Sequence, residues 1–150
     1  EQGYIHYAAG LFCRPHHGCL YELQRMAGAE TLAMGVGAIS VTDGYMVRNT
    51  NNLRLYVKHA GNFEKMTAKV LTTTDDFMMA RYAQGCLETT EGLLSERFEK
   101  RFNTQIPDFI RAQLSACADT GLIEEKDGRF VPTQKGQYQA LYGPLLHFED

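Results

Sequence analysis

The most informative stretch of the sequence is Leu122-Ile123-Glu124-Glu125-Lys126-Asp127-Gly128-Arg129-Phe130-Val131-Pro132. Asp127-Gly128 separates two short β-forming runs, and this pair is strongly preferred in the tight turn of a β-hairpin. The stretch therefore predicts two antiparallel strands. Thr133 follows directly and predicts the N-cap of a last helix, from Gln134 to about Tyr142.

Three helices are predicted before this hairpin. Their signals are a capped start at Thr74-Asp75-Asp76 for a helix to about Glu88, Ser95 for a short helix through Phe102, and Pro107 for a third helix that Gly121 ends. Helix, helix, helix, hairpin and helix is the layout of a winged-helix-like, mostly helical module. The sequence thus predicts an α+β fold class.

The first half of the chain has the sequence signals of strands and turns more than of helices. Residues 4–7 begin it like a strand, and residues 14–18 have the proline and glycine of a turn. The apolar run over residues 32–41 predicts a buried strand, with Gly35 and Gly37 where another segment packs closely or a ligand approaches the backbone.

One helix is predicted in this half, after several N-cap candidates in residues 49–52. Its apolar positions are Leu53, Tyr56, Val57 and Ala60, with Gly61 after them. Residues 62–69 are predicted as a polar connector, so we expect the boundary between two units there.

Composition and charge exclude several classes of protein. The 150 residues are 44% hydrophobic and 22% charged, enough for a domain with a core. No stretch approaches the length of a membrane span and no signal peptide is visible, so we expect no membrane partner and a cytoplasmic location with four reduced cysteines. Residues 1–75 carry a net charge of +1 and residues 76–150 of −4. The acidic second half argues against a nucleic-acid partner.

The densest group of chemically active side chains is Cys13-Arg14-Pro15-His16-His17-Gly18-Cys19. Two Cys and two His are zinc ligands, but this spacing is not a common zinc pattern, so we expect no metal here. The guanidinium of Arg14 suits a carboxylate or phosphate. The alternative is that Arg14 bonds loop carbonyl groups and fixes the turn, and both interpretations stay open.

Three segments together resemble the C-terminal region of the oxygen-independent coproporphyrinogen III oxidase family of radical S-adenosylmethionine (SAM) enzymes. They are Gly3-Tyr4 with residues 11–17, similar to the family's "GY…FARP"; residues 28–40 with Asn49-Thr50; and the module from about Leu71, with Thr90-Glu91-Gly92-Leu93, Arg97-Phe98 and Thr133-x-x-Gly136. The chain begins within a strand-like stretch without Met, so we expect a C-terminal fragment of a longer enzyme.

This resemblance implies two domains. Residues 1–62 would be the end of a partial (β/α) barrel, and residues 63–150 the family's small C-terminal helical domain. The full-length enzyme would hold a 4Fe-4S cluster through an upstream C-x3-C-x2-C motif, together with SAM. This chain lacks that motif. We therefore expect no cofactor in the fragment and no activity from it alone.

The resemblance also implies site residues and partners. Leu20, Tyr21 and Ile39 match positions that line a second SAM site in the oxidase, although the family's Phe-Gln is replaced by Leu20-Tyr21. Arg14 would bind the tetrapyrrole substrate. The reaction would be the anaerobic oxidative decarboxylation of coproporphyrinogen III. The alternatives are a haem-utilisation relative that opens the haem ring, a haem chaperone, or, in another class, a winged-helix binding module.

The remaining expected partner is the chain's own missing N-terminal barrel. Without that barrel, apolar strand edges would be exposed, so we expect the fragment to self-associate.

Overall fold

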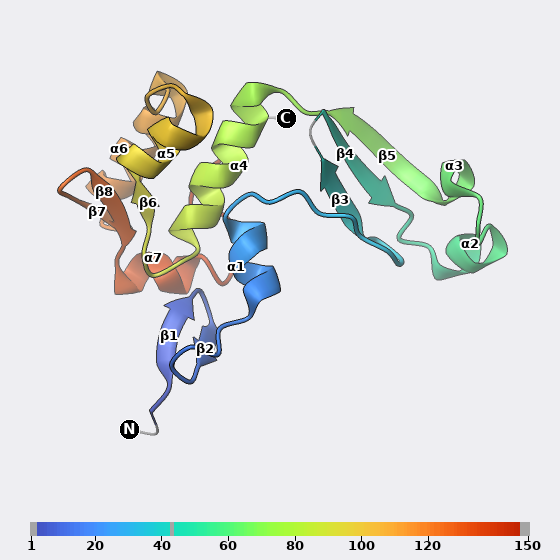
Figure 1. Ribbon diagram of the computed structural model, residues 1–150, viewed down its shortest axis with the longest axis horizontal. Coiled ribbons are helices and arrows are strands. Elements are labelled where there is room, and N and C mark those ends of the chain that lie inside the picture. The colour runs from blue at the N-terminus through green and yellow to red at the C-terminus, as the bar shows by residue number, and fades with distance from the viewer. Residues whose placement is uncertain (1–2, 43, 148–150) are drawn as a thin grey trace. The chain divides into compact units, whose positions relative to one another are not determined.

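The computed structural model describes residues 3–42 and 44–147 and divides them between two compact units (Figure 1). Unit 1 combines Glu1–Gly28 with Met79–Asp150, and unit 2 is Ala29–Met78. Unit 1 is therefore built from both ends of the chain. None of the helices in the described ranges is long and apolar enough to cross a membrane.

The N-terminal part of unit 1 is a hairpin followed by a helix. β1 (Ile5–Ala8) pairs antiparallel with β2 (Leu11–Cys13), and the predicted turn follows, closed by a bond from the amide of His17 to the carbonyl of Arg14. The chain then forms α1 (Leu20–Met26), which sequence reasoning did not predict. The Cys, His and Pro residues directly before α1 are typical of a turn, so the sequence did not indicate that a helix begins there.

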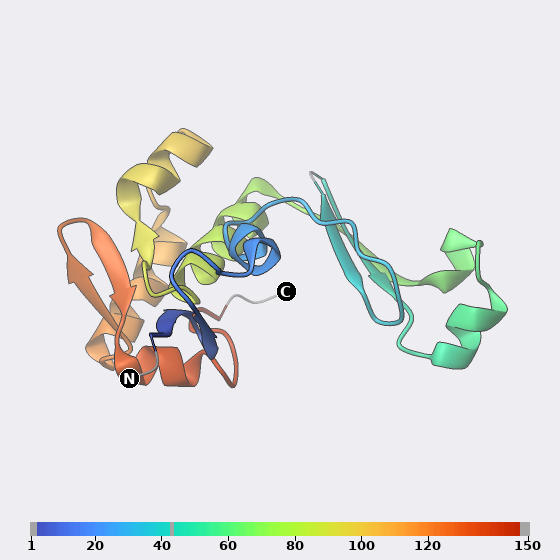
Figure 2. The ribbon, with the colours of Figure 1, turned by 60° about the horizontal axis from the view of Figure 1, so that its bottom comes forward.

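The C-terminal part of unit 1 has the predicted order of elements. They are α4 (Asp75–Leu87), which belongs to unit 1 from Met79 on, β6 (Leu93–Leu94), α5 (Ser95–Phe102), α6 (Asp108–Asp119), β7 (Ile123–Lys126), β8 (Arg129–Pro132) and α7 (Gln134–Gln139). The hairpin is confirmed, and β6 joins it to give a sheet of order β6-β8-β7, visible in Figure 2. The segment before α5 was expected to be only a connection, so β6 is an addition.

The predicted turn and cap residues act as expected. Asp127 and Gly128 have φ values of +51° and +71°, which suit the tight turn between β7 and β8. The hydroxyl of Thr133 accepts a hydrogen bond from the amide of Gly136 at 3.1 Å, and that of Thr74 accepts one from the amide of Phe77 at 3.2 Å. Local polar chemistry therefore sets the ends of α4 and α7, although α7 ends about three residues earlier than expected.

The core of unit 1 lies among α4, α5, α6 and the β6-β8-β7 sheet. Ile110 and Leu114 of α6 are fully buried, as the spacing predicted. Phe98 of α5 is also fully buried and meets Tyr82 and Phe102, with ring centroids 6.0 and 4.8 Å away. Burial of these large side chains is the main favourable term in the stability of the unit.

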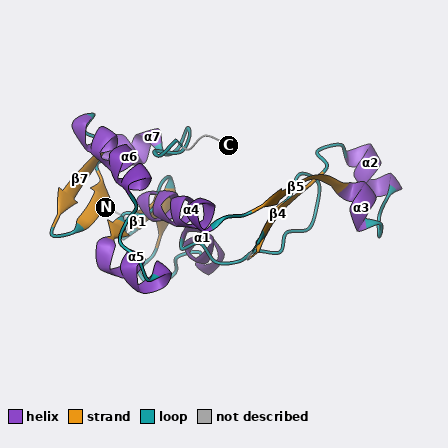
Figure 3. Cartoon of the chain, turned by 90° about the horizontal axis from the view of Figure 1, so that it is seen from above, coloured by secondary structure: helices purple, strands orange, loops and turns teal. Residues whose placement is uncertain are grey.

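Unit 2 is a three-stranded antiparallel sheet with two short helices. β3 (Ile39–Thr42) pairs with β4 (Tyr45–Asn49), which pairs with β5 (Thr67–Thr72); α2 (Leu53–Lys58) and α3 (Phe63–Met66) connect β4 to β5, as Figure 3 shows. α2 was predicted, and the Asn52 side chain caps it by accepting from the amide of Leu55 at 3.1 Å.

Two expectations for this region are wrong. Residues 62–69 are not a connector, because they form α3 and begin β5. The apolar run from Leu32 is a strand only from Ile39, since Gly35 and Gly37 have φ values of +118° and +68° that break an extended chain. A Cβ on Gly35 would meet no atom within 4 Å, so close packing does not explain that glycine.

The α+β class is confirmed, and the barrel part of the prediction differs from what is observed. A (β/α) barrel pairs its strands in parallel, whereas every strand pair in the described ranges is antiparallel. The predicted boundary at residue 62 falls inside unit 2, so packing does not divide the chain there. As a division between a barrel segment and a C-terminal domain, that boundary stays a prediction.

Candidate functional site

A pocket of about 620 Å³ opens on unit 1. Its walls come from segments far apart in the sequence: the β1–β2 hairpin with Ala9 and Leu11, α1 with Glu22 and Arg25, the end of α4 with Glu88, and residues 140–144 after α7. Met26, Leu141 and Pro144 make part of the wall apolar. The pocket thus offers charged and apolar surfaces side by side.

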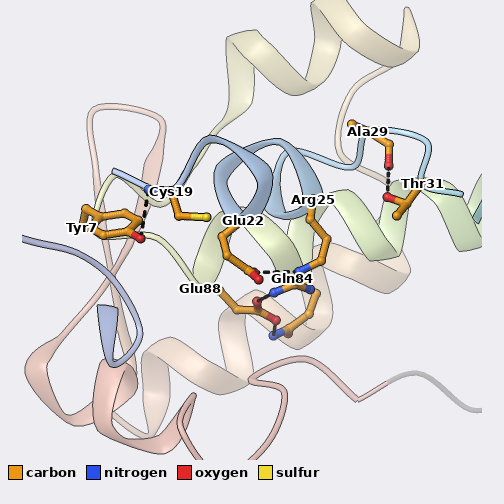
Figure 4. A network of polar contacts seen from close by, with 8 residues as sticks. All are labelled: Tyr7, Cys19, Glu22, Arg25, Ala29, Thr31, Gln84 and Glu88. Atoms are coloured by element: carbon orange, nitrogen blue, oxygen red, sulfur yellow. Dashed lines mark hydrogen bonds and ion pairs between the residues drawn. The ribbon is translucent and has the colours of Figure 1, made fainter. Parts of the chain in front are cut away.

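A chain of polar contacts joins Glu22, Arg25, Glu88 and Gln84, as Figure 4 shows. Arg25 Nε donates to Glu22 Oε2 at 2.9 Å, and its Nη2 lies 3.5 Å from Glu88 Oε2. Gln84 Nε2 donates to Glu88 Oε1 at 3.3 Å, while Gln84 Oε1 accepts from the amide of Leu146 at 2.9 Å. The polar wall is therefore tied to the C-terminal segment.

The charges in this network favour the ionised arginine. Burial alone would lower the pKa of Arg25, but the hydrogen bond and charge of Glu22 and the charge of Glu88 outweigh burial and raise it. The carboxylates of Glu22 and Glu88 flank the guanidinium, so groups that line the pocket compensate the positive charge of Arg25. Its Nε and Nη2 are already engaged, and the two carboxylates keep free acceptor sites.

Two close contacts fix the position of α1, one with α4 and one with α5. Gly85 has no side chain because a Cβ there would overlap the carbonyl oxygen of Met26, at the end of α1. Arg101 of α5 donates from Nη1 to Ala27 O and from Nη2 to Gly28 O, both at 3.0 Å. The guanidinium of Arg101 also lies 4.9 Å from the ring centroid of Tyr82. A cation at a helix C-terminus is favourable, so these contacts fix the helix that carries Glu22 and Arg25.

The structure places the site residues suggested by the sequence on exposed surface. Leu20 and Tyr21 form the first turn of α1 and are 67% and 57% exposed. Arg14 is exposed in the turn before α1. Ile39 begins β3 in unit 2 and is 43% exposed. None of the four lines the pocket in the described part of unit 1, and their proposed roles stay predictions.

Comparison with known proteins gives the C-terminal part of the chain a family. Residues 86–138 match the family described as the HemN C-terminal domain. The matched segment is similar to that domain. It spans β6, α5, α6, the β7–β8 hairpin and most of α7. No curated protein matches the sequence.

The likeness in fold extends beyond the HemN C-terminal domain. The solved structure of coproporphyrinogen III oxidase (HemN) from Escherichia coli, described as a radical SAM enzyme, matches with a TM-score of 0.64 and 20% identity. The match covers 91% of this chain but 35% of the Escherichia coli chain. It shows that the two share a fold over most of the present sequence, which is about one third of the length of the bacterial enzyme.

The pocket residues were missed by sequence reasoning. Glu22 and Arg25 have the i, i+3 spacing of a helical ion pair, a signal that becomes visible only once α1 is predicted. Glu88 pairs with Arg25 across 63 positions, and Gln84 meets Leu146 across 62. Nothing in a single sequence indicates contacts at such separations.

The thiols and imidazoles do not fit an iron–sulfur cluster or a zinc ion. Cys13 and Cys117 are buried, Cys86 is partly buried and Cys19 is exposed. Cys117 Sγ donates to Leu145 O at 3.2 Å, and burial beside Tyr82 raises the pKa of Cys86 to about 11. No group of three or more His, Cys, Asp or Glu residues in the described ranges is placed to hold a metal. We therefore derive no chemical step through a cluster in this chain.

Proposed function

We propose that the chain supplies the C-terminal part of a radical SAM oxidoreductase that acts on a tetrapyrrole. The reaction proposed for the full-length protein is the anaerobic oxidative decarboxylation of coproporphyrinogen III. The observation that carries this proposal is the match of residues 86–138 to the HemN C-terminal domain, within a fold that matches 91% of the chain to the Escherichia coli oxidase. In this proposal the cluster and the bound SAM belong to an upstream domain, and this chain is inactive alone.

The chain's own contribution would be to bind and orient the substrate. A tetrapyrrole has a broad apolar ring and carboxylate side chains, so a guanidinium such as Arg14 is a fitting anchor for one carboxylate. Arg14 is exposed, and its carbonyl oxygen accepts a hydrogen bond from the amide of His17 at 3.0 Å. The alternative is that the Arg14 side chain fixes the turn, but within the described residues this side chain makes no hydrogen bond or ion pair.

Titration of the 150-residue chain with coproporphyrin tests this binding role. We expect a saturable change in the porphyrin absorption that Arg14→Gln weakens several-fold. Arg111→Gln is the matched control, because Arg111 is an exposed arginine on α6 in the same unit. An unchanged absorption spectrum would show that the fragment does not bind the porphyrin, and equal affinity in all three proteins would show that Arg14 is not its anchor.

The enzymatic part of the proposal is tested in the parent gene, in the sequence that encodes the residues before Glu1. The parent reading frame is expected to encode C-x3-C-x2-C before Glu1, and a parent protein that carries no such motif would exclude the radical reaction. A haem-utilisation relative or a haem chaperone is the second candidate, because Leu20-Tyr21 replaces the oxidase's Phe-Gln. Titration with haem in place of coproporphyrin distinguishes these, since each relative should bind its own tetrapyrrole more tightly.

A binding module of another class is favoured by one observation. Helix α4, strand β6, helices α5 and α6, and the β7–β8 hairpin follow the order of a winged helix. Arg97 on α5 is paired with Glu91 at 3.0 Å, and this half of the chain has a net charge of −4, so the charges oppose nucleic-acid binding. A mobility shift with DNA at low salt that disappears by about 0.2 M would favour the module, and no shift would remove it.

A further inference from the structure

Three arginine side chains of unit 1 form one group of like charges. They are Arg25 of α1, Arg81 of α4 and Arg101 of α5, and the positive charges of Arg25 and Arg101 both act on Arg81. Such a group of like charges is stable only where each charge finds compensation. Each of the three guanidinium groups therefore needs a partner that compensates its positive charge.

Two of the three guanidinium groups are compensated. Arg25 has the carboxylates of Glu22 and Glu88 at 2.9 and 3.5 Å. Arg101 donates to two carbonyl oxygens at the end of α1 and lies over the rings of Tyr82 and Phe102. Both side chains are thus held in place by several contacts.

Arg81 is not compensated in this way. Its Nη1 is buried and has no hydrogen-bond partner among the residues that the structure describes. The ion pairs in the same described ranges involve Arg25, Arg97 and Lys126, and Arg81 is in none of them. Burial and the charges of Arg25 and Arg101 lower the pKa of Arg81, and the more weakly acting Glu88 offsets only part of this. An unpaired, partly buried guanidinium is costly and calls for an explanation.

We propose that Arg81 is the centre of an anion-binding site that takes a small oxyanion, either a carboxylate or a phosphate group. The guanidinium fork matches the paired oxygens of both groups. The three guanidinium groups carry three positive charges, and the carboxylates of Glu22 and Glu88 carry two negative ones. One bound monoanion would therefore make the group neutral. Arg81 as a whole is only partly buried, so an anion reaches it from solvent after rotation of its last side-chain bonds. This proposal does not depend on the function proposed above. Glu22 and Arg25, which pair with each other in the pocket, are not among the groups that would bind the anion.

A bound water molecule is the simpler partner for Nη1. Water satisfies the hydrogen bond but leaves the charge of Arg81 beside two other cations. The two cases differ in what added anions do. Water predicts that the protein responds to ionic strength alone, whereas an anion site predicts a saturable response at matched ionic strength.

Thermal unfolding of the 150-residue chain separates these cases. Inorganic phosphate and acetate are each titrated against sodium chloride at equal ionic strength, with wild type, Arg81→Gln and Arg111→Gln. At a tenfold excess over the dissociation constant, the bound anion should raise Tm by about 3 °C in wild type and Arg111→Gln. Arg81→Gln should lose this rise, and without added anion its Tm should equal or exceed that of wild type, since an uncompensated charge is removed.

The outcome also assigns the chemical class. A rise with phosphate alone assigns a phosphate site, and a rise with acetate alone assigns a carboxylate site. No rise above the chloride control, or the same rise in Arg81→Gln, would overturn the proposal. Should Arg81→Gln fail to fold, Arg81→Lys keeps the charge without the fork and should bind at least several-fold more weakly. The arginine Nε–H signals in wild-type NMR spectra then report binding directly, and their failure to shift would overturn the site.

Discussion

At the scale of single residues, the packing of α1 on α4 depends on a missing side chain. A Cβ at Gly85 would lie 2.8 Å from the carbonyl carbon of Met26 and overlap its oxygen. Gly85→Ala should therefore destabilise the protein by about 1–3 kcal/mol, even though alanine is the better helix former by about 1 kcal/mol. Urea unfolding measures this loss. Gly143→Ala is the control and should change little, because a Cβ there meets no atom within 4 Å.

Cys86 gives unit 1 a dependence on alkaline pH. Burial raises its pKa from 9.0 to about 11, against the lowering effect of its hydrogen bond with Tyr82. Above pH 9 the unfolded thiol loses its proton while the folded one keeps it, so stability falls as pH rises toward 11. Between pH 8 and pH 10 this loss should be about 1 kcal/mol.

Urea midpoints at these two pH values measure the effect. Cys86→Ser should remove most of the fall, because a hydroxyl does not ionise in this range, and the exposed Cys19→Ser should keep it. The pKa of Tyr82 is also raised, from 10.0 to about 12, chiefly by burial, and this adds a fall only above pH 10. An equal fall in wild type and Cys86→Ser would contradict the assignment.

At the scale of elements, the β7–β8 turn shows how local chemistry sets structure. Asp127 and Gly128 both have positive φ, which costs a non-glycine residue about 1–2 kcal/mol. Gly128→Ala should lower stability by roughly 1 kcal/mol, measured by urea unfolding. Asp127→Asn should stay within about 0.5 kcal/mol of wild type, because Asn also adopts this conformation. A destabilising Asp127→Asn would mean that the Asp127 carboxylate matters, not the turn geometry.

The elements that sequence reasoning predicted correctly are those with local signals. The hairpin, the caps at Thr74, Thr133 and Asn52, and the buried face of α6 all follow from residues within one or two turns of each other. α1, α3 and β6 were missed because they are short, and short elements depend on tertiary contacts for their stability. β5 was missed because its pairing with β4 lies outside its own sequence.

At the scale of the whole molecule, the candidate pocket shows the limit of sequence reasoning. Its walls come from residues 9–26, 88 and 140–144, which meet only because unit 1 is assembled from both ends of the chain. A continuous boundary near residue 62 followed from composition, and composition does not reveal that the first 28 residues pack with the last 72. The family resemblance is confirmed for residues 86–138, which match the HemN C-terminal domain.

Unit 2 has little core of its own. Its buried apolar side chains among the described residues are Val41 and Met66, while Leu32, Met34 and Phe63 are 82%, 92% and 81% exposed. Exposed apolar surface of this extent favours association. We therefore expect the 150-residue chain to self-associate, with a mass that rises with concentration in sedimentation velocity experiments.

The triple variant Leu32→Ser, Met34→Ser, Phe63→Ser tests which surface is responsible. It should shift the mass toward the monomer, because exposed side chains contribute little to the fold and most to the association. A matched control replaces three exposed charged residues of unit 2 with glutamine, Arg54, Lys58 and Glu64, and should associate like wild type. A monomeric wild type at high concentration would contradict the expectation. If the apolar triple variant associates as strongly as wild type, the contact surface lies on unit 1, where Phe12 and Leu20 are also exposed.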